Sequence, residues 1–306
     1  MSKENSDLIN KYLEFVFVQK NLSKNTLISY QNDLQEFSNI FGKIYLANGF
    51  DQKIDEYIKY LSEKFSPKSH CRKLSSVRNF LSYLFDLKLI KKNPTNDIEF
   101  PKIPKNVPKF LSEIEVDKII QKSYENKSFK GLRTTLLIEI LYATGIRVSE
   151  LVSIKLGDIK DDYSSLMIKS KGGDFRYVPL FGVVMDILKK YLDDNLRLQS
   201  EKSKFLFPSN SKIGHLTRHR FFQILKDLSV KAGLDKNKIS PHVIRHSFAS
   251  HLLNRGVDLR IIQESLGHKD ISTTQIYTHI QAKKLRKILE NKHNVTVKLK
   301  KFEKLS

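Results

Sequence analysis

The sequence divides at Asn93-Pro-Thr-Asn-Asp-Ile-Glu-Phe-Pro-Lys-Ile-Pro-Lys-Asn-Val-Pro108, a stretch that contains Pro94, Pro101, Pro104 and Pro108. Proline at this density prevents helix continuation and sheet pairing, because its ring fixes φ and removes the backbone N–H donor. We therefore interpret the stretch as a semi-rigid linker between two domains. The predicted boundaries are a first domain over residues 1–100, a linker over 101–109 and a second domain over 110–306.

The segment before the linker has the spacing of amphipathic helices. Apolar residues recur at steps of three and four over residues 27–41, and Gly42 follows as a predicted C-cap. The same spacing returns over residues 74–84, and we expect four short helices within residues 8–92. Several basic side chains flank one of these helices, and they either line a phosphate backbone or form an exposed polar face: Lys64, Lys68, Arg72, Lys73 and Arg78.

The segment after the linker mixes helical and strand patterns. Ser112-Glu-Ile-Glu115 is a capping box that predicts a helix start, and the apolar run 132–144 predicts a helix that ends at Gly145. Alternating apolar residues on either side of Lys171-Gly-Gly-Asp174 predict a β-hairpin. Further helices are expected over about 182–199, about 218–232, and from Ser240 to Gly256. The expected fold is mainly α with a small antiparallel sheet.

Charge is the first indication of function. The chain has 54 Lys and Arg against 33 Asp and Glu, a formal net charge of +21. A surplus of this size attracts a polyanion, and nucleic acid is the common one. A solvated surface tuned for solubility has the same composition, so charge alone leaves both interpretations open. The basic residues are spread along the chain rather than massed on one helix, which disfavours an anionic membrane as partner.

Other classes of protein are excluded by what the sequence lacks. No apolar run approaches the roughly 18–20 residues that span a bilayer, and the polar N-terminus has no signal-peptide core, so we expect a cytoplasmic protein. The single cysteine, Cys71, excludes an internal disulfide and a multi-cysteine metal site. Without a phosphate loop or a Rossmann glycine pattern, ATP hydrolysis and dinucleotide chemistry are disfavoured. We expect no cofactor and no metal.

The segment from Ser240 to His251 is dense in imidazole and guanidinium groups. On a helix, His242, Arg245 and His246 share one face because they lie three or four residues apart. A zinc site here lacks the glutamate of H-E-x-x-H, and the adjacent arginine would repel the ion. Arginine and histidine without carboxylates instead suit a phosphodiester, whose oxygens match the guanidinium fork. We interpret His246 itself as a structural residue that donates to a buried carbonyl.

Three further candidates lie elsewhere in the chain. Arg147 follows Gly145 and is expected near the start of the next helix, and Lys171 lies at the hairpin tip, where a general acid can reach a substrate. Tyr277 is a candidate nucleophile, although a phenol of pKa about 10 needs nearby cations or a base to attack at neutral pH. Taken singly, each also fits an ordinary role as a surface cation, a capping partner or a half-buried aromatic.

Together these motifs resemble the lambda-integrase-like tyrosine recombinases, and most closely their bacterial Xer branch. The matching stretches are Thr144-Gly-Ile-Arg147-Val-Ser-Glu-Leu151, Lys171 with Arg176-Tyr-Val-Pro-Leu180, His242-Val-Ile-Arg245-His-Ser-Phe-Ala249, and Leu266-Gly-His268 with Ser272-Thr-Thr-Gln-Ile-Tyr277-Thr-His279. The resemblance covers almost the whole chain. It implies an N-terminal helical, SAM-like core-binding domain and a C-terminal catalytic domain. Residues 242–260 resemble the D-type member of the branch more than the C-type.

The resemblance implies an active site of six residues: Arg147, Lys171, His242, Arg245, His268 and Tyr277. The two arginines would clamp the scissile phosphate, and His268 would donate to a non-bridging oxygen. Tyr277 would attack to give a 3′-phosphotyrosyl bond, with Lys171 protonating the departing 5′ oxygen and His242 assisting proton transfer. The hairpin departs from the family pattern, because Ser170-Lys171-Gly172-Gly173-Asp174 replaces Gly-Lys-Gly, so Lys169 remains an alternative acid.

The resemblance also implies partners. These are duplex DNA, a paired sister recombinase within a tetrameric synaptic complex, and an FtsK-type DNA translocase, in a reaction that resolves chromosome dimers at cell division. Two alternatives stay open: a phage or mobile-element integrase of the same chemistry, and a non-catalytic DNA-binding architectural protein. Genome context and the DNA site bound would identify the first alternative. The presence of all six residues disfavours the second.

Overall fold

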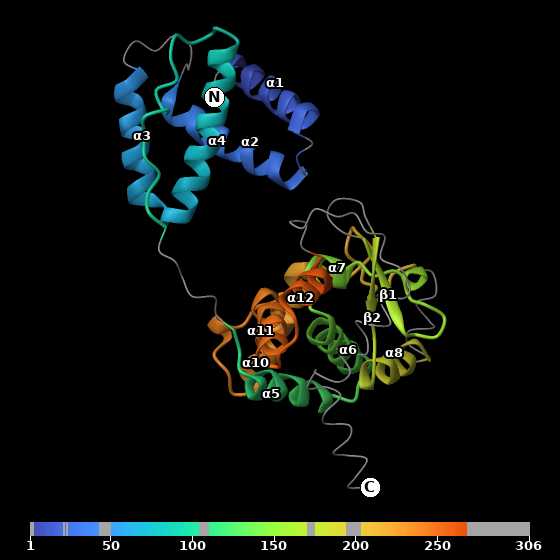
Figure 1. Cartoon of the computed structure of the whole chain (residues 1–306). Helices are drawn as coiled ribbons and strands as arrows, with labels where there is room; N and C mark the ends of the chain where they lie inside the picture. The colour runs from blue at the N-terminus through green and yellow to red at the C-terminus, as the bar shows by residue number, and fades with distance from the viewer. Residues whose placement is uncertain are drawn as a thin grey trace, which may run out of the picture. The chain divides into compact units, whose positions relative to one another are not determined.

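The chain folds into two compact units, Met1–Asn106 and Val107–Ser306 (Figure 1). The computed structural model describes residues 3–20, 22, 24–42, 50–103, 110–169, 175–193 and 203–267. Within those residues, no helix is long and apolar enough to cross a membrane.

The described part of the first unit consists of helices α1 (Lys3–Lys20), α2 (Lys24–Phe41), α3 (Phe50–Lys64) and α4 (Pro67–Asp86). Their apolar faces form one core that includes Tyr12, Phe37, Tyr57 and Phe80. The apolar residues that predicted a helix over residues 74–84 are fully buried in α4, as the helical spacing requires. The helical prediction for this unit is confirmed.

The first part of the proline-rich stretch packs against α4. Asn93 donates from its side-chain amide to the Ser82 hydroxyl at 2.9 Å. Arg78 donates to the carbonyl of Ile98, and its guanidinium lies 4.3 Å from the centre of the Phe100 ring. These residues therefore belong to the first unit, and residues 104–109 of the expected linker lie outside the described part of the chain.

A buried ion-pair network joins α4 to α2 and corrects one expectation. Lys73 is only 6% exposed and donates to Asp33 at 3.2 Å and to Glu36 at 2.9 Å. Arg72 also donates to Asp33 but remains partly exposed, and Lys68 is exposed. The suggestion that Lys73 lines a phosphate backbone is wrong, because its buried ammonium group forms ion pairs with two carboxylates inside the domain.

The second unit is built around helix α6 (Phe129–Thr144), in which every residue from Thr135 to Thr144 is buried. A helix that is apolar on all sides belongs in the interior of a domain. Helices α5 (Glu113–Tyr124), α8 (Val183–Asp193) and α11 (Pro241–Asn254) pack around it (Figure 1). The remaining helices of four residues or more in the described part are α7 (Val148–Val152), α10 (Arg218–Lys231) and α12 (Leu259–Leu266).

One antiparallel hairpin lies beside this helical core. Strands β1 (Ser165–Lys169) and β2 (Phe175–Pro179) pair with Ile168 opposite Arg176. The expected mainly helical fold with a small antiparallel sheet is therefore confirmed. The tip of the hairpin, including Lys171, lies outside the described residues.

The helix-start signals read from the sequence are present. Ser112 and Glu115 form the predicted capping box of α5, and Ser240 caps α11 with Pro241 in its first turn. Arg255 of the short turn that follows α11 pairs with Glu113 of α5 at 2.6 Å. Ser240 and Pro241 therefore fix the start of α11, the helix that carries His242 and Arg245, whereas the Arg255 pair lies beyond its other end.

Candidate active site

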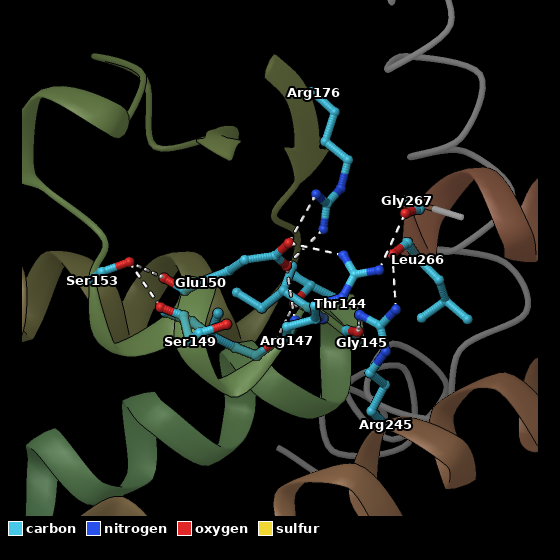
Figure 2. Close-up of polar contacts among 12 residues, drawn as sticks. Thr144, Gly145, Arg147, Ser149, Glu150, Ser153, Arg176, Arg245, Leu266 and Gly267 are labelled. Atoms are coloured by element: carbon cyan, nitrogen blue, oxygen red, sulfur yellow. Dashed lines mark hydrogen bonds and ion pairs between the residues drawn. The ribbon is translucent and has the colours of Figure 1, made fainter. Parts of the chain in front are cut away.

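Three of the six expected site residues lie in the described part of the chain. They are Arg147, His242 and Arg245, whereas Lys171, His268 and Tyr277 lie outside it. The structure brings Arg147 and Arg245 together, from the start of α7 and from α11, around the C-terminal end of α12 (Figure 2).

Arg147 is positioned by a sharp turn between two helices. Gly145 ends α6 with a φ of 61°, a left-handed conformation that favours glycine, and Arg147 then becomes the N-cap residue of α7. Its backbone N–H donates to Glu150 Oε2 at 2.8 Å, and its Nη1 donates to Glu150 Oε1 at 3.1 Å. The side chain is 34% exposed, so the guanidinium is held on one side and accessible on the other.

Arg245 is held by the carbonyl groups at two helix ends. Its Nη1 donates to the carbonyl of Gly145 at 2.6 Å, and its Nη2 donates to that of Leu266 at 2.8 Å. Arg147 Nη2 reaches the next carbonyl along, that of Gly267, at 3.3 Å. The C-terminal ends of α6 and α12 carry partial negative charge, and both therefore favour the cations placed there.

The close approach of these cations perturbs Arg245. Burial and the neighbouring charge of Arg147 lower the pKa of Arg245 to about 10, although Glu150 opposes the shift. Arg245 is therefore still charged at neutral pH, and its charge is incompletely compensated by the protein. A site of this kind attracts an anion, because an added negative charge relieves the repulsion between the arginines.

Two residues outside the six predicted ones, Glu150 and Arg176, join Arg147 and Arg245 in one arginine cluster. Arg176 of β2 donates from Nη1 to Glu150 Oε1 at 3.2 Å and from Nη2 to Oε2 at 2.8 Å (Figure 2). Burial raises the pKa of Glu150, but the bonds and charge of Arg176 and the bonds from Arg147 outweigh it, so the pKa is lowered. Glu150 is therefore ionised at neutral pH, and it accepts hydrogen bonds from two guanidinium groups, those of Arg147 and Arg176.

The alternation of side chains along the second strand indicates that Arg176 is buried. Side chains alternate between the two faces of a strand, and Arg176 has the same parity as the buried Val178 and Leu180. A charged residue at a buried position requires a buried partner of opposite charge. A signal for Glu150 is its position three residues after Arg147 at a helix start, where a glutamate side chain can accept from the N-cap backbone N–H.

Of the histidines of α11, His246 does not have the role expected from the sequence. His242 lies in the first turn and is exposed, three residues before Arg245. The interpretation of His246 as a donor to a buried carbonyl is wrong, because His246 is exposed. His251 fills that role: its Nε2 donates to the carbonyl of Leu111 at 2.8 Å, and its Nδ1 accepts from the Tyr142 hydroxyl at 2.9 Å.

Lys169, the alternative general acid, is on the outer face of the hairpin. It pairs with Phe175, and its ammonium lies 5.7 Å from the centre of that exposed ring. Arg176, which points to Glu150, belongs to the other face, because neighbouring residues of a strand point in opposite directions. The Lys169 side chain therefore leaves the sheet on the side away from the arginine cluster.

The arrangement is suited to a phosphodiester. Arg147 and Arg245 are rigidly placed donors with a shared excess of positive charge, and a transferring phosphoryl group is stabilised mainly by such charge. The guanidinium fork also matches two oxygens of one phosphate. The carbonyls of Gly145, Leu266 and Gly267 keep both arginines in place before any substrate arrives.

Comparison with known proteins gives matches over nearly the whole chain. A family model described as phage integrase family matches residues 109–284, and one described as phage integrase, N-terminal SAM-like domain matches residues 9–88. Tyrosine recombinase XerD of Rhizobium meliloti (strain 1021) is 39% identical over 311 residues, covering 98% of this chain and 99% of the relative.

Solved structures share the fold. The XerH site-specific recombinase bound to difH substrate in a pre-cleavage complex superposes with a TM-score of 0.63 at 22% identity, covering 92% of this chain and 94% of the other. A lambda integrase tetramer bound to a Holliday junction superposes with a TM-score of 0.65 at 17% identity, covering 93% of this chain and 77% of the other.

Proposed function

The chain belongs to the phage integrase family of tyrosine recombinases, and on that premise we propose that its six motif residues form one DNA-cleaving site. The chain is a site-specific recombinase, an enzyme that cuts and rejoins DNA strands. The six residues are Arg147, Lys171, His242, Arg245, His268 and Tyr277. The observation that carries the proposal is the convergence of Arg147 and Arg245 on the ends of α6 and α12, with a charge excess that suits a phosphate.

The chemistry follows from the charges and donors available. Arg147 and Arg245 hold the non-bridging oxygens of the scissile phosphate, and His268 donates to the same group. The phenol oxygen of Tyr277 attacks phosphorus, and His242 assists the transfer of the phenol proton. Lys171 gives a proton to the 5′ oxygen as its bond to phosphorus breaks, which leaves a 3′-phosphotyrosyl bond and a free 5′ hydroxyl.

The second half of the reaction reverses the first with a different strand. A 5′ hydroxyl from the other DNA strand attacks the phosphotyrosyl bond, and Tyr277 leaves with its proton restored. Each step exchanges one phosphate ester bond for another. The energy of the broken bond is conserved, so the cycle needs no nucleotide hydrolysis.

Two observations on the hairpin support Lys171 over Lys169 as the acid. Lys169 is on the face of β1 that points away from Arg176 and the arginine cluster. Its ammonium also contacts the Phe175 ring on that outer face. Lys171 matches the lysine of the family's hairpin motif, and we propose it as the acid on that ground.

The assembly proposed for the chain follows its relatives. We infer that the two units bind duplex DNA together, and that protomers pair on a recombination site and exchange strands as a tetramer through a Holliday junction. Similarity to XerD further suggests that the reaction resolves chromosome dimers at cell division, with a second recombinase and an FtsK-type translocase as partners. We propose a cytoplasmic location, where the chromosome lies.

The test of this function is formation of a covalent protein–DNA complex. Chromosomal DNA from the host, enriched on the purified protein and sequenced, gives the bound site, and a nicked duplex containing that site traps the cleaved state. The wild-type protein should give a protein–DNA band on a denaturing gel. Tyr277→Phe should bind the duplex with the same affinity and give no band, because only the attacking oxygen is lost. A covalent band from Tyr277→Phe would disprove the assignment of the nucleophile.

A further inference from the structure

Arg176 lies where three parts of the second unit meet. It extends from the inner face of β2, is 4% exposed, and makes a two-pronged contact with Glu150 at the start of α7. Its Cζ lies only 3.1 Å from the position that a Cβ would occupy on Gly267, at the end of α12. The Arg176 side chain therefore connects β2, which carries it, to Glu150 beside the Arg147 turn, and its guanidinium lies against Gly267.

Glu150 is shared between Arg176 and Arg147. Its Oε1 accepts from the Nη1 of both arginines, at 3.1 Å from Arg147 and 3.2 Å from Arg176. Its Oε2 accepts from the Arg147 backbone N–H and from Arg176 Nη2, each at 2.8 Å. The Arg176 and Glu150 side chains are 5% and 7% exposed, so they form a buried pair, whereas Arg147 is 34% exposed.

This sharing decides how much positive charge faces a substrate. With Arg176 present, the carboxylate is neutralised by a buried partner, and Arg147 and Arg245 together retain a charge of about +2 toward a phosphate. Without Arg176, the buried carboxylate would depend on Arg147 alone. That contact would cancel the charge of Arg147 and draw its guanidinium toward the protein, away from a scissile phosphate.

We propose that Arg176 is a positioning residue for strand cleavage, which neutralises Glu150 so that Arg147 keeps its charge and its direction for the scissile phosphate. The inference rests on the proposed function, since it assigns a role within the same site. Stability alone does not account for the pair, because replacing a buried ion pair by apolar side chains is often neutral or stabilising.

The test compares Arg176→Met with the double variant Arg176→Met/Glu150→Gln in single-turnover cleavage of the nicked duplex. Misplacement of a catalytic group by a change away from the chemistry can cost about a hundredfold, so Arg176→Met should cleave roughly ten- to a hundredfold more slowly at saturating protein. Removing the unpaired carboxylate as well should restore most of that loss. Arg255→Met, which removes another arginine–glutamate pair of the same unit, should cleave at the wild-type rate.

A charge-specific substrate separates this role from a structural one. A methylphosphonate at the scissile position has no negative oxygen to neutralise, so the deficit of Arg176→Met relative to wild type should shrink on that duplex. If Arg176→Met does not fold, Arg176→Gln replaces it in both comparisons, because the amide still donates to one oxygen of Glu150.

The outcomes are distinct. The inference is overturned if the double variant is as slow as the single variant, if the deficit is equal on phosphate and methylphosphonate, or if Arg176→Met cleaves like wild type. Failure of the wild-type protein to form a covalent complex would instead reject the proposed function, and the inference with it.

Discussion

Replacing Arg245 by lysine keeps a positive charge at the centre of the site but removes the planar guanidinium group with its several donors. The guanidinium of Arg245 donates through two different nitrogens to the carbonyls of Gly145 and Leu266, at 2.6 and 2.8 Å. A lysine has a single nitrogen, which cannot serve both carbonyls and also present a fork to a phosphate. We therefore expect Arg245→Lys to lose much more in catalysis than in DNA binding.

The two losses have different sizes. One buried carbonyl left without its donor costs about 1–3 kcal/mol of folding free energy, which the protein should survive. Loss of a preorganised donor to the transition state costs roughly 10²–10³-fold in rate, or about 2.7–4 kcal/mol. DNA affinity should change little, because it depends on many phosphate contacts along the duplex.

The assay measures covalent complex formed in a single turnover on the nicked duplex, with DNA affinity and thermal unfolding measured on the same preparation. Arg255→Lys is the matched control, since Arg255 lies just beyond the same helix and pairs with Glu113 instead of the site. If Arg245→Lys cleaves within a few-fold of the wild type, Arg245 only ties α6 to α12 and the phosphate-clamp assignment is wrong.

Three further predictions test other parts of the account. Lys171→Ala should cleave ordinary DNA slowly and should be largely rescued by a 5′-bridging phosphorothioate, because the thiolate leaves without a proton. Lys169→Ala should cleave ordinary DNA normally. If Lys169→Ala is the slow variant that the phosphorothioate rescues, Lys169 and not Lys171 is the general acid. DNA affinity, measured by fluorescence anisotropy, should fall with salt at a log–log slope of about −0.9 per neutralised phosphate, and a flat dependence would argue against backbone-driven binding. Gly145→Ala should lower the thermal midpoint and the cleavage rate together, because its Cβ would lie 2.4 Å from Phe248 Cδ1 at a φ of 61°; an unchanged midpoint would show that the turn tolerates a side chain.

The local sequence was sufficient to predict most of the helices and the hairpin, and it singled out two of the three arginines of the cluster. Helical spacing, the Ser112 capping box and the Ser240-Pro241 start depend on residues within one or two turns of each other, so local sequence is sufficient to specify them. The motifs also singled out Arg147 and Arg245, because a guanidinium suits a phosphate wherever the chain places it.

The partners of these residues were decided by tertiary structure. The sequence pattern suggested His246 as the buried donor, whereas contacts with Tyr142 of α6 and with Leu111, just before α5, give that role to His251. Lys73 likewise reads as a surface cation until α2 brings two carboxylates to it.

In the arginine cluster, too, tertiary structure decides which residues are partners. Glu150 and Arg176 are far apart in sequence, and their pairing depends on the face of β2 that meets α7. Arg176 and Arg147 lower the pKa of Glu150 against the effect of burial, whereas burial itself lowers the pKa of Arg245. Both shifts depend on desolvation and on charges supplied by other elements. The sequence determines which groups are present, but the packing of α6, α7, α11, α12 and the hairpin determines which of them share a charge, since Coulomb interactions follow distance in space rather than separation along the chain.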